Sequence, residues 1–230
     1  MNWTDRLALF APLDFAALAT LILLWLFIGW RIENPGANPS VSRLMGQYRR
    51  DWMVQMITRQ PRIFDAQTLS TLRQGTSFFA SATMIAIGGS LALIGNSDRL
   101  TGLANQLTLE SDPTFVWEVK VLLITAFLTN AFLKFVWSHR LFGYCAVLMA
   151  ATPNDPEDPL AHTRAAQAGE INIFAARSFN RGLRSVYFSL GSAAWMIGAS
   201  ALILAAAITF AVLWRREFAS KSRQVLMNTG

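Results

Sequence analysis

The stretch FVWEVKVLLITAFLTNAFLKFVWSHR, from Phe115 to Arg140, is apolar enough to cross a membrane and yet carries charged and amide side chains. A helix needs about 20 predominantly apolar residues to cross a hydrocarbon core of about 30 Å. The helical pattern continues to Ala151 with no proline before Pro153, so this helix would be roughly twice as long as the hydrocarbon requires. We therefore predict a membrane span over residues 115–137 whose helix continues beyond the bilayer.

The whole chain has the composition of a membrane protein. Of its 230 residues, 53% are hydrophobic and 15% are charged, whereas an ordinary soluble domain has roughly 25% charged residues. The mean hydropathy of +0.34 agrees. We therefore predict an all-α integral membrane four-helix bundle that forms a single domain, residues 1–230. The predicted spans lie near residues 14–31, 76–95, 115–137 and 190–214, with helical extensions into the cytoplasm over 41–75 and 138–187.

The basic residues flank the apolar stretches, which points to membrane topology and argues against nucleic acid as a partner. Twelve arginines lie in the two longer loops: 31, 43, 49, 50, 59, 62, 73, 140, 164, 177, 181 and 184. Six basic residues lie in the remaining flanks: Arg6, Arg99, Arg215, Arg216, Lys221 and Arg223. With four spans, the positive-inside rule places both termini outside the cytoplasm. The four basic residues after Trp214 contradict that placement, and an odd number of crossings would remove the conflict.

Two connecting segments have distinct signals. Residues 96–113 carry Asp98, Glu110 and Asp112 and are predicted to form a non-cytoplasmic loop. The segment NDPEDP, residues 154–159, predicts a turn in which Asp158 caps the next helix. We expect that helix, which carries residues 171, 174, 179 and 183 on its apolar side, to lead directly into the fourth span.

The polar residues of the third span have two interpretations. Lys120 and Lys134 are fourteen residues apart, so they lie on almost the same helix face; Ser138 extends this stripe, Asn130 lies one turn from Lys134, and Glu118 points to the other side. Long cationic side chains near the ends of a span reach the headgroups, which is the simpler interpretation. The alternative is a polar path for an ion, a proton or a small anion along the bundle interior.

Two further groups of residues are candidate contact sites. Arg177, Arg181 and Arg184 follow a four-then-three spacing, and we interpret this face either as a site for anionic lipid or an acidic partner, or as a solvated surface. Ala82, Ala86 and Ser90 form a stripe of small residues, which is typical of helix packing in membranes.

The sequence contains no recognisable centre for catalysis, for a cofactor or for a metal. Its one cysteine, Cys145, excludes an intramolecular disulfide and a cysteine cluster. His139 and His162 are the only histidines, and His162 lies in a polar loop, which argues against a membrane haem. The acidic residues 155, 157 and 158 lack the spacing of a calcium loop. We therefore predict no catalytic, cofactor-binding or metal-binding residue.

Five segments together resemble the uncharacterised integral-membrane family catalogued as domain of unknown function 599. These segments are YRRDWMVQM (48–56), FFAS (78–81), WEVK (117–120), FLKFVWSHRLFGYC (132–145) and FNRGLRSVYF (179–188). The resemblance implies an all-helical membrane protein of about four spans and implies no activity or cofactor.

We expect a multi-pass protein of a bacterial inner membrane that serves as an accessory or structural subunit. It would dock a protein partner through its cytoplasmic helix extensions, with membrane lipids and their anionic headgroups as further contacts, and form a homo-oligomer through the small-residue stripe. The alternative is a small transporter or channel with a polar path along the third helix.

Overall fold

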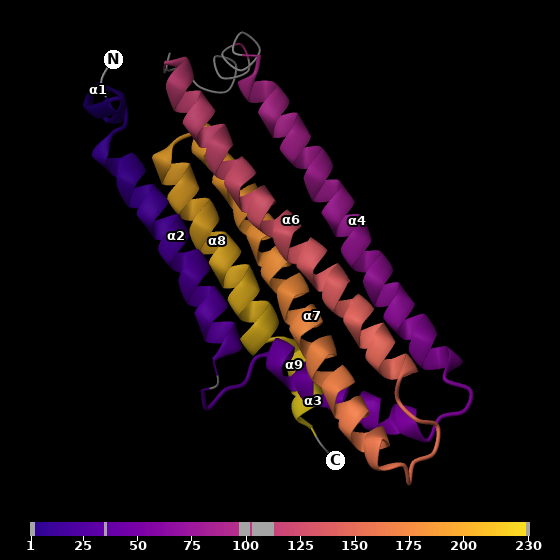
Figure 1. Cartoon of the computed structure of the whole chain (residues 1–230). Coiled ribbons are helices and arrows are strands. Elements are labelled where there is room, and N and C mark those ends of the chain that lie inside the picture. The colour runs from indigo at the N-terminus through magenta and orange to yellow at the C-terminus, as the bar shows by residue number, and fades with distance from the viewer. Residues whose placement is uncertain (1–2, 35, 97–101, 103–112, 229–230) are drawn as a thin grey trace. The chain divides into compact units, whose positions relative to one another are not determined.

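The computed structural model of the chain describes residues 3–34, 36–96, 102 and 113–228. Every regular element in these ranges is helical, which confirms the predicted all-α class (Figure 1). The elements are α1 (Trp3–Leu7), α2 (Pro12–Glu33), α3 (Val41–Ile57), α4 (Ile63–Ile94), α6 (Thr114–Ala150), α7 (Pro159–Ser192), the 3-10 helix η1 (Ala193–Met196), α8 (Ala199–Phe218) and α9 (Lys221–Met227). Most of the predicted acidic loop, residues 97–101 and 103–112, lies outside the described residues.

Four helical regions are long and apolar enough to cross a membrane, as predicted. They are α2, α4, α6 and the region Ala199–Met227, which begins with α8. α6 has 37 residues, which at 1.5 Å per residue makes it about 55 Å long. α6 is therefore much longer than a hydrocarbon core, as the opening stretch predicts.

The fourth predicted span, residues 190–214, begins too early. α7 ends at Ser192, η1 follows, and Gly198 has a φ of 152° before α8 begins. Only glycine adopts such a φ without strain, so the chain breaks its helix at this residue. The helix that carries residues 171–183 therefore ends before the apolar region of α8. The prediction missed the break because the neighbouring alanines and methionine all favour helix.

The turn before α7 confirms the predicted cap. Asp158 Oδ1 accepts a hydrogen bond from the Leu160 amide at 2.8 Å, and Pro159 is the first residue of the helix. Proline suits that position because its missing amide hydrogen would have no helical partner there.

The chain separates into two compact units. Unit 1 comprises Met1–Arg31, Thr83–Ala131 and Leu183–Arg216, and unit 2 comprises Ile32–Ala82, Phe132–Gly182 and Glu217–Gly230. Helices α4, α6 and α7 contribute residues to both units, so the single domain expected from the sequence stays a prediction.

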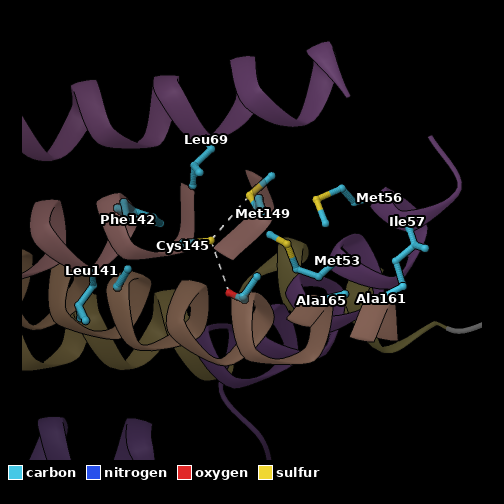
Figure 2. Packing of buried hydrophobic residues seen from close by; sticks show 12 residues of the cluster. Met53, Met56, Ile57, Leu69, Leu141, Phe142, Cys145, Met149, Ala161 and Ala165 are labelled. Atoms are coloured by element: carbon cyan, nitrogen blue, oxygen red, sulfur yellow. Dashed lines mark hydrogen bonds between the residues drawn. The ribbon is translucent and has the colours of Figure 1, made fainter. Parts of the chain in front are cut away.

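Unit 2 has an apolar core between α3, α4, α6 and α7 (Figure 2). Met53 and Met56 of α3 belong to one cluster of buried residues with Cys145 and Met149 of α6 and with alanines of α7. The full set of buried residues is Met53, Met56, Ile57, Leu69, Leu141, Phe142, Cys145, Met149, Ala161, Ala165, Ala168 and Ala175. The first predicted helical extension, residues 41–75, thus begins with α3, which buries Met53 and Met56 in this core.

Unit 1 contains α1, η1 and parts of α2, α4, α6, α7 and α8, and turns many large apolar side chains outward. Leu23 and Leu204 are more than 60% exposed, and Ile85 is 76% exposed. Conversely, Lys120 and Arg184 are buried, with 5% and 6% exposed. This distribution is the one that an apolar solvent selects, because a charge is costly against lipid.

Candidate functional site

A set of hydrogen bonds between α6 and α7, which we name the polar seam, holds several of the polar residues of α6. In unit 1, Asn130 Nδ2 donates to Ser185 Oγ at 2.6 Å, and Ser189 Oγ donates to the Ile124 carbonyl oxygen at 3.3 Å. Both bonds join the two helices directly. Thr125 instead donates within α6, to the Val121 carbonyl.

The polar seam continues in unit 2. Ser138 Oγ donates to the Ala175 carbonyl oxygen at 2.7 Å, and both residues are fully buried. Ser178 Oγ donates to the Lys134 carbonyl oxygen at 2.9 Å. The polar seam thus consists of Asn130, Ser138, Ser178, Ser185 and Ser189.

A glycine lets the two helices approach closely within unit 2. A Cβ built at Gly182 would lie 2.6 Å from Cε1 of Phe135, which is fully buried. The Phe135 ring also contacts the rings of Phe79 and Phe179, each with centroids 5.4 Å away. Small residues and interhelical hydrogen bonds are the usual means by which membrane helices associate. The polar groups at 130 and 138 are therefore explained by packing against α7.

The two lysines that the sequence places on one face of α6 belong to different units. Lys120 lies in unit 1, buried, with Nζ 4.3 Å from the centroid of the Trp117 ring. Lys134 lies in unit 2 and is half-buried, and Glu118 is half-buried in unit 1. A buried Lys120 fits an interior position better than one that reaches outward to the headgroups. A polar path along all these residues stays a prediction.

The three arginines of α7 do not form one exposed face. Arg177 is exposed, with its guanidinium carbon 5.6 Å from the Phe174 ring centroid. Arg181 forms a bidentate ion pair with Glu33, in which Nε donates to Oε1 at 2.9 Å. Arg184 is buried in unit 1, where a Cβ added at Gly29 would lie 3.9 Å from its Nε. The three arginines therefore do not share one exposed face, and their role in contact with a lipid or a partner stays a prediction.

The small-residue stripe of α4 lies largely open. Ala82 and Ala86 are exposed, and Ser90 Oγ donates to the Ala86 carbonyl at 2.9 Å. Only 6% of the apolar window of α4 is buried, compared with 39% for α6. Contact between copies of the chain through this stripe stays a prediction.

Sequence reasoning missed a cluster that ties the α3–α4 connection to the α6–α7 turn in unit 2. Arg62 donates to the carbonyl oxygens of Thr152 and Pro153, each at 2.7 Å, and Gln60 Nε2 donates to the Asn154 carbonyl at 3.0 Å. An open hollow of about 530 Å³ is lined by Arg59, Gln60, Pro61, Arg62 and Asn154. The end of α6 leaves carbonyl groups that need donors, which is the signal that predicts a cationic cap here.

A second missed cluster joins α3 to the start of α4. Trp52 Nε1 donates to Asp65 Oδ1 at 2.7 Å, and Arg59 forms an ion pair with the same carboxylate. Asp65 is fully buried. A charged carboxylate is retained in a core only when it is paired and hydrogen-bonded, so this cluster fixes the α3–α4 corner.

The core of unit 2 contains one polar chain of contacts. Arg49 donates to Asn172 Oδ1, and Asn172 Nδ2 donates to Cys145 Sγ at 3.6 Å. The Cys145 thiol in turn donates to the Ala168 carbonyl at 3.4 Å, which is one of the dashed lines in Figure 2. Burial lowers the pKa of the Arg49 guanidinium. A buried thiol in apolar surroundings is chemically inert, so these contacts serve structure.

The described residues contain no group of three or more His, Cys, Asp or Glu side chains that could hold a metal ion. The clusters described above join helices to one another and do not place a nucleophile beside a base, as nucleophilic catalysis requires.

Comparison with curated proteins and with solved structures finds no match. The model of one protein family, described as protein of unknown function, DUF599, matches residues 16–222. That range includes all five sequence segments on which the resemblance rests. The chain is therefore a member of the DUF599 family of proteins of unknown function.

Proposed function

We propose that the chain is a multi-pass protein of a bacterial inner membrane and serves as an accessory or structural subunit. Unit 1, together with the adjoining turns of α4 and α7, would lie in the hydrocarbon, and the remainder of unit 2 would dock a protein partner on the cytoplasmic side. The observation that carries this proposal is an exposed apolar stripe on α6 within unit 2.

The outward face of unit 1 supports its location in lipid. Leu23 and Phe27 of α2, Ile85 of α4, and Leu204 and Ile208 of α8 are all large, apolar and exposed. Exposing apolar surface to water costs about 25 cal/mol per Å², and lipid removes that cost. A protein of this surface would therefore stay with the membrane when peripheral proteins are washed away.

The docking stripe consists of Leu133, Trp137, Arg140, Tyr144 and Val147. These residues follow a four-three-four-three spacing, so they form one seam along α6. The four apolar members are between 42% and 68% exposed. Arg140 Nε donates to the Tyr144 hydroxyl at 2.6 Å, which holds both side chains on the stripe.

The chemistry of unit 2 indicates the kind of partner that fits the docking stripe. Unit 2 carries thirteen Lys and Arg against eight Asp and Glu, a net charge of +5. Complementary charge favours association with an oppositely charged surface. The partner would therefore present a helix with an apolar seam flanked by acidic residues. That seam would pack against the docking stripe, whose residues have a heptad-like spacing.

Site-specific photocrosslinking tests the docking stripe in intact cells. A benzoylphenylalanine placed at position 144 or 147 is expected to give one discrete protein adduct of the same identity. The same probe at Gln167, an exposed position of α7 in unit 2, is the control and is expected to give none. The adduct from 144 should vanish in L133E, which inserts a charge into the seam. Adducts to lipid alone, or equal adducts at 167, would refute the docking role.

Membrane embedding is tested separately by carbonate extraction. The chain is expected to remain in the pellet at high pH, as spanning proteins do. Release into the supernatant would refute the membrane part of the proposal, whatever the crosslinking shows.

A second candidate function, a polar path for an ion or small anion, is favoured by the burial of Lys120 and Arg184 inside unit 1. A cysteine scan of residues 120–138 in a C145A background tests this path. Labelling by a water-soluble thiol reagent at periodic positions along one face would support it. Uniform protection, together with unchanged ion flux in liposomes for K120M, would exclude it.

A further inference from the structure

We infer that the chain crosses the membrane five times, with the last part of α7 as an enclosed fifth crossing, so that the two termini lie on opposite sides. This inference rests on the proposed location of unit 1 in the membrane. It adds one crossing to the four helices that are apolar enough to be recognised by composition.

One end of unit 1 is defined by contacts between the starts of α2, α6 and α8. Trp195 of η1, just before α8, donates through Nε1 to Asp14 Oδ1 at 2.6 Å, near the start of α2. Trp117, near the start of α6, lies in a cluster with Ile94, the last residue of α4, and with Met196. The ends of α4 and α7 therefore meet the starts of the other three helices here.

At the opposite end of unit 1, the later residues of α2 and α8 lie beside each other, and α8 contacts the first α7 residues of unit 1, which begins at Leu183 on this helix. The Arg31 guanidinium lies 6.0 Å from the Trp214 ring centroid, and Arg216 donates to the Tyr187 hydroxyl. Asn130 of α6 is bonded to Ser185 at this level. Helices α2, α6 and α8 thus run in one direction through unit 1, and α4 and α7 run in the other.

Composition does not reveal this fifth crossing because its side chains do not face outward. Among residues 183–192, only Leu190 is exposed. Ser185 and Ser189 are bonded to α6, while a Cβ at Gly191 would lie 3.0 Å from Thr209 Oγ1 and 3.7 Å from the Ala205 carbonyl of α8. A helix enclosed by other helices has no need of an apolar surface, since lipid never touches it.

α7 is long enough for this role. It has 34 residues, which corresponds to about 51 Å at 1.5 Å per residue. A hydrocarbon core of about 30 Å would take roughly the last 20 of these residues, so the crossing continues from unit 1 into the adjoining α7 turns of unit 2 and leaves about four turns outside.

Contacts within unit 2 lead independently to the same crossing number. Glu217, directly after α8, accepts from the Ser42 amide at 3.0 Å and from Ser42 Oγ at 2.8 Å. Arg223 Nε donates to the Pro39 carbonyl at 2.9 Å. The tail and the α2–α3 connection therefore lie on one side of the membrane. An even number of crossings must separate Ser42 from Glu217, and α4, α6 and α8 supply only three.

The five-crossing arrangement also removes the charge conflict in the sequence. With the tail on the same side as the two longer loops, sixteen flanking basic residues lie on that side and two, Arg6 and Arg99, lie on the other. The positive-inside rule then makes the first side cytoplasmic. The amino terminus and the α7–α8 junction would face the periplasm.

Cysteine labelling of intact cells tests this topology in a C145A background. I197C, at a 67% exposed position of the α7–α8 junction, is expected to react with a membrane-impermeant maleimide as fully in intact cells as after permeabilisation. K221C, in α9, is expected to react only after permeabilisation. The C145A parent, which has no cysteine, is the control and should remain unlabelled.

A second measurement does not depend on the cysteine variants folding. Green fluorescent protein fused after residue 230 is expected to fluoresce, and alkaline phosphatase fused there is expected to be inactive. Labelling of K221C in intact cells, or an active phosphatase fusion, would overturn the fifth crossing while leaving the chain a membrane protein. Release of the chain by carbonate would instead refute the membrane location itself.

Discussion

Unit 1 and unit 2 are both helical, but they distribute polar and apolar side chains in opposite ways. Unit 1 buries Lys120 and Arg184 and exposes residues such as Leu23 and Ile85. Unit 2 buries a cluster of methionines, alanines and Phe142, and its charged residues other than Asp65 are exposed or half-buried. The difference shows which solvent each unit suits: apolar groups are driven inward only where water surrounds them, whereas lipid leaves hydrogen bonds and close packing to hold helices together.

The largest expected difference between the units concerns apolar truncation. F142A, in the core of unit 2, is expected to lower the free energy of unfolding by about 3–5 kcal/mol, because it removes buried area and leaves a cavity. F27A, on the outward face of unit 1, is expected to cost less than about 1 kcal/mol in mixed micelles, because lipid or detergent replaces the lost contacts. Titration with a denaturing detergent measures both. Equal losses would contradict the assignment of two solvents.

The next largest expected loss of stability comes from disturbing the close packing of α6 against α7 in unit 2. G182A in unit 2 is expected to destabilise the protein by about 1–3 kcal/mol, because its Cβ would overlap the Phe135 ring. G88A in unit 1 is the matched control, since nothing lies within 4 Å of its Cβ position. That control is expected to be neutral or to stabilise α4 by up to about 1 kcal/mol, because alanine favours helix over glycine. Thermal unfolding in mild detergent distinguishes the two variants. A neutral G182A would show that the α6–α7 contact is loose.

Removal of the Arg62 cap at the end of α6 tests whether the stability of unit 2 depends on its helix connections as well as on its core. R62M is expected to cost about 1–3 kcal/mol, because it leaves the carbonyls of Thr152 and Pro153 without their donor. R43M, at an exposed position of α3, should stay within about 0.5 kcal/mol of the parent. Limited proteolysis after residues 151–158 reports opening of the turn. Equal protection of R62M and the parent would rule out the cap.

The smallest expected change in stability concerns the hydrogen bonds of the polar seam, compared between unit 1 and unit 2. A double-mutant cycle of N130A and S185A in unit 1 is expected to give a coupling near 0.6 kcal/mol, the typical value for hydrogen bonds between membrane helices. S138A in unit 2, which removes a second donor to the Ala175 carbonyl, is expected to cost about 1 kcal/mol, because a buried hydrogen bond between the two helices is lost. Detergent-induced unfolding measures both. A zero coupling at 130 and 185 would remove Asn130 from the polar seam.

The sequence predicts the elements whose outward surface is apolar. The lengths of α2, α4 and α6 and the cap at Asp158 follow from hydropathy and turn chemistry, because these signals are local. The role of α7 in unit 1 does not follow from hydropathy, since its polar residues are compensated by Asn130, by the Ile124 carbonyl and by close contact with α8. The break at Gly198 was missed for a similar reason: a single glycine among good helix formers does not reveal its φ.

The candidate sites were predicted to different degrees. Periodicity selected Asn130 and Ser138, and the structure adds what periodicity cannot supply, their partners on another helix. The alignment of Arg177, Arg181 and Arg184 is a property of one helix, but Glu33 and the neighbours of Arg184 come from elsewhere in the chain. The roles of Arg62 and Asp65 could not be predicted, because their partners are backbone carbonyls and an indole group whose positions in the sequence follow no regular spacing.

The bonds between Ser42 and Glu217 join residues that are 175 positions apart. A ribosome adds about 5–20 residues per second, so Ser42 is made about 9–35 s before its partner exists. During this interval the α2–α3 connection cannot reach its final state, and a nascent chain that stops before α8 never reaches it. Completion of these contacts of unit 2 therefore requires that translation has passed Glu217.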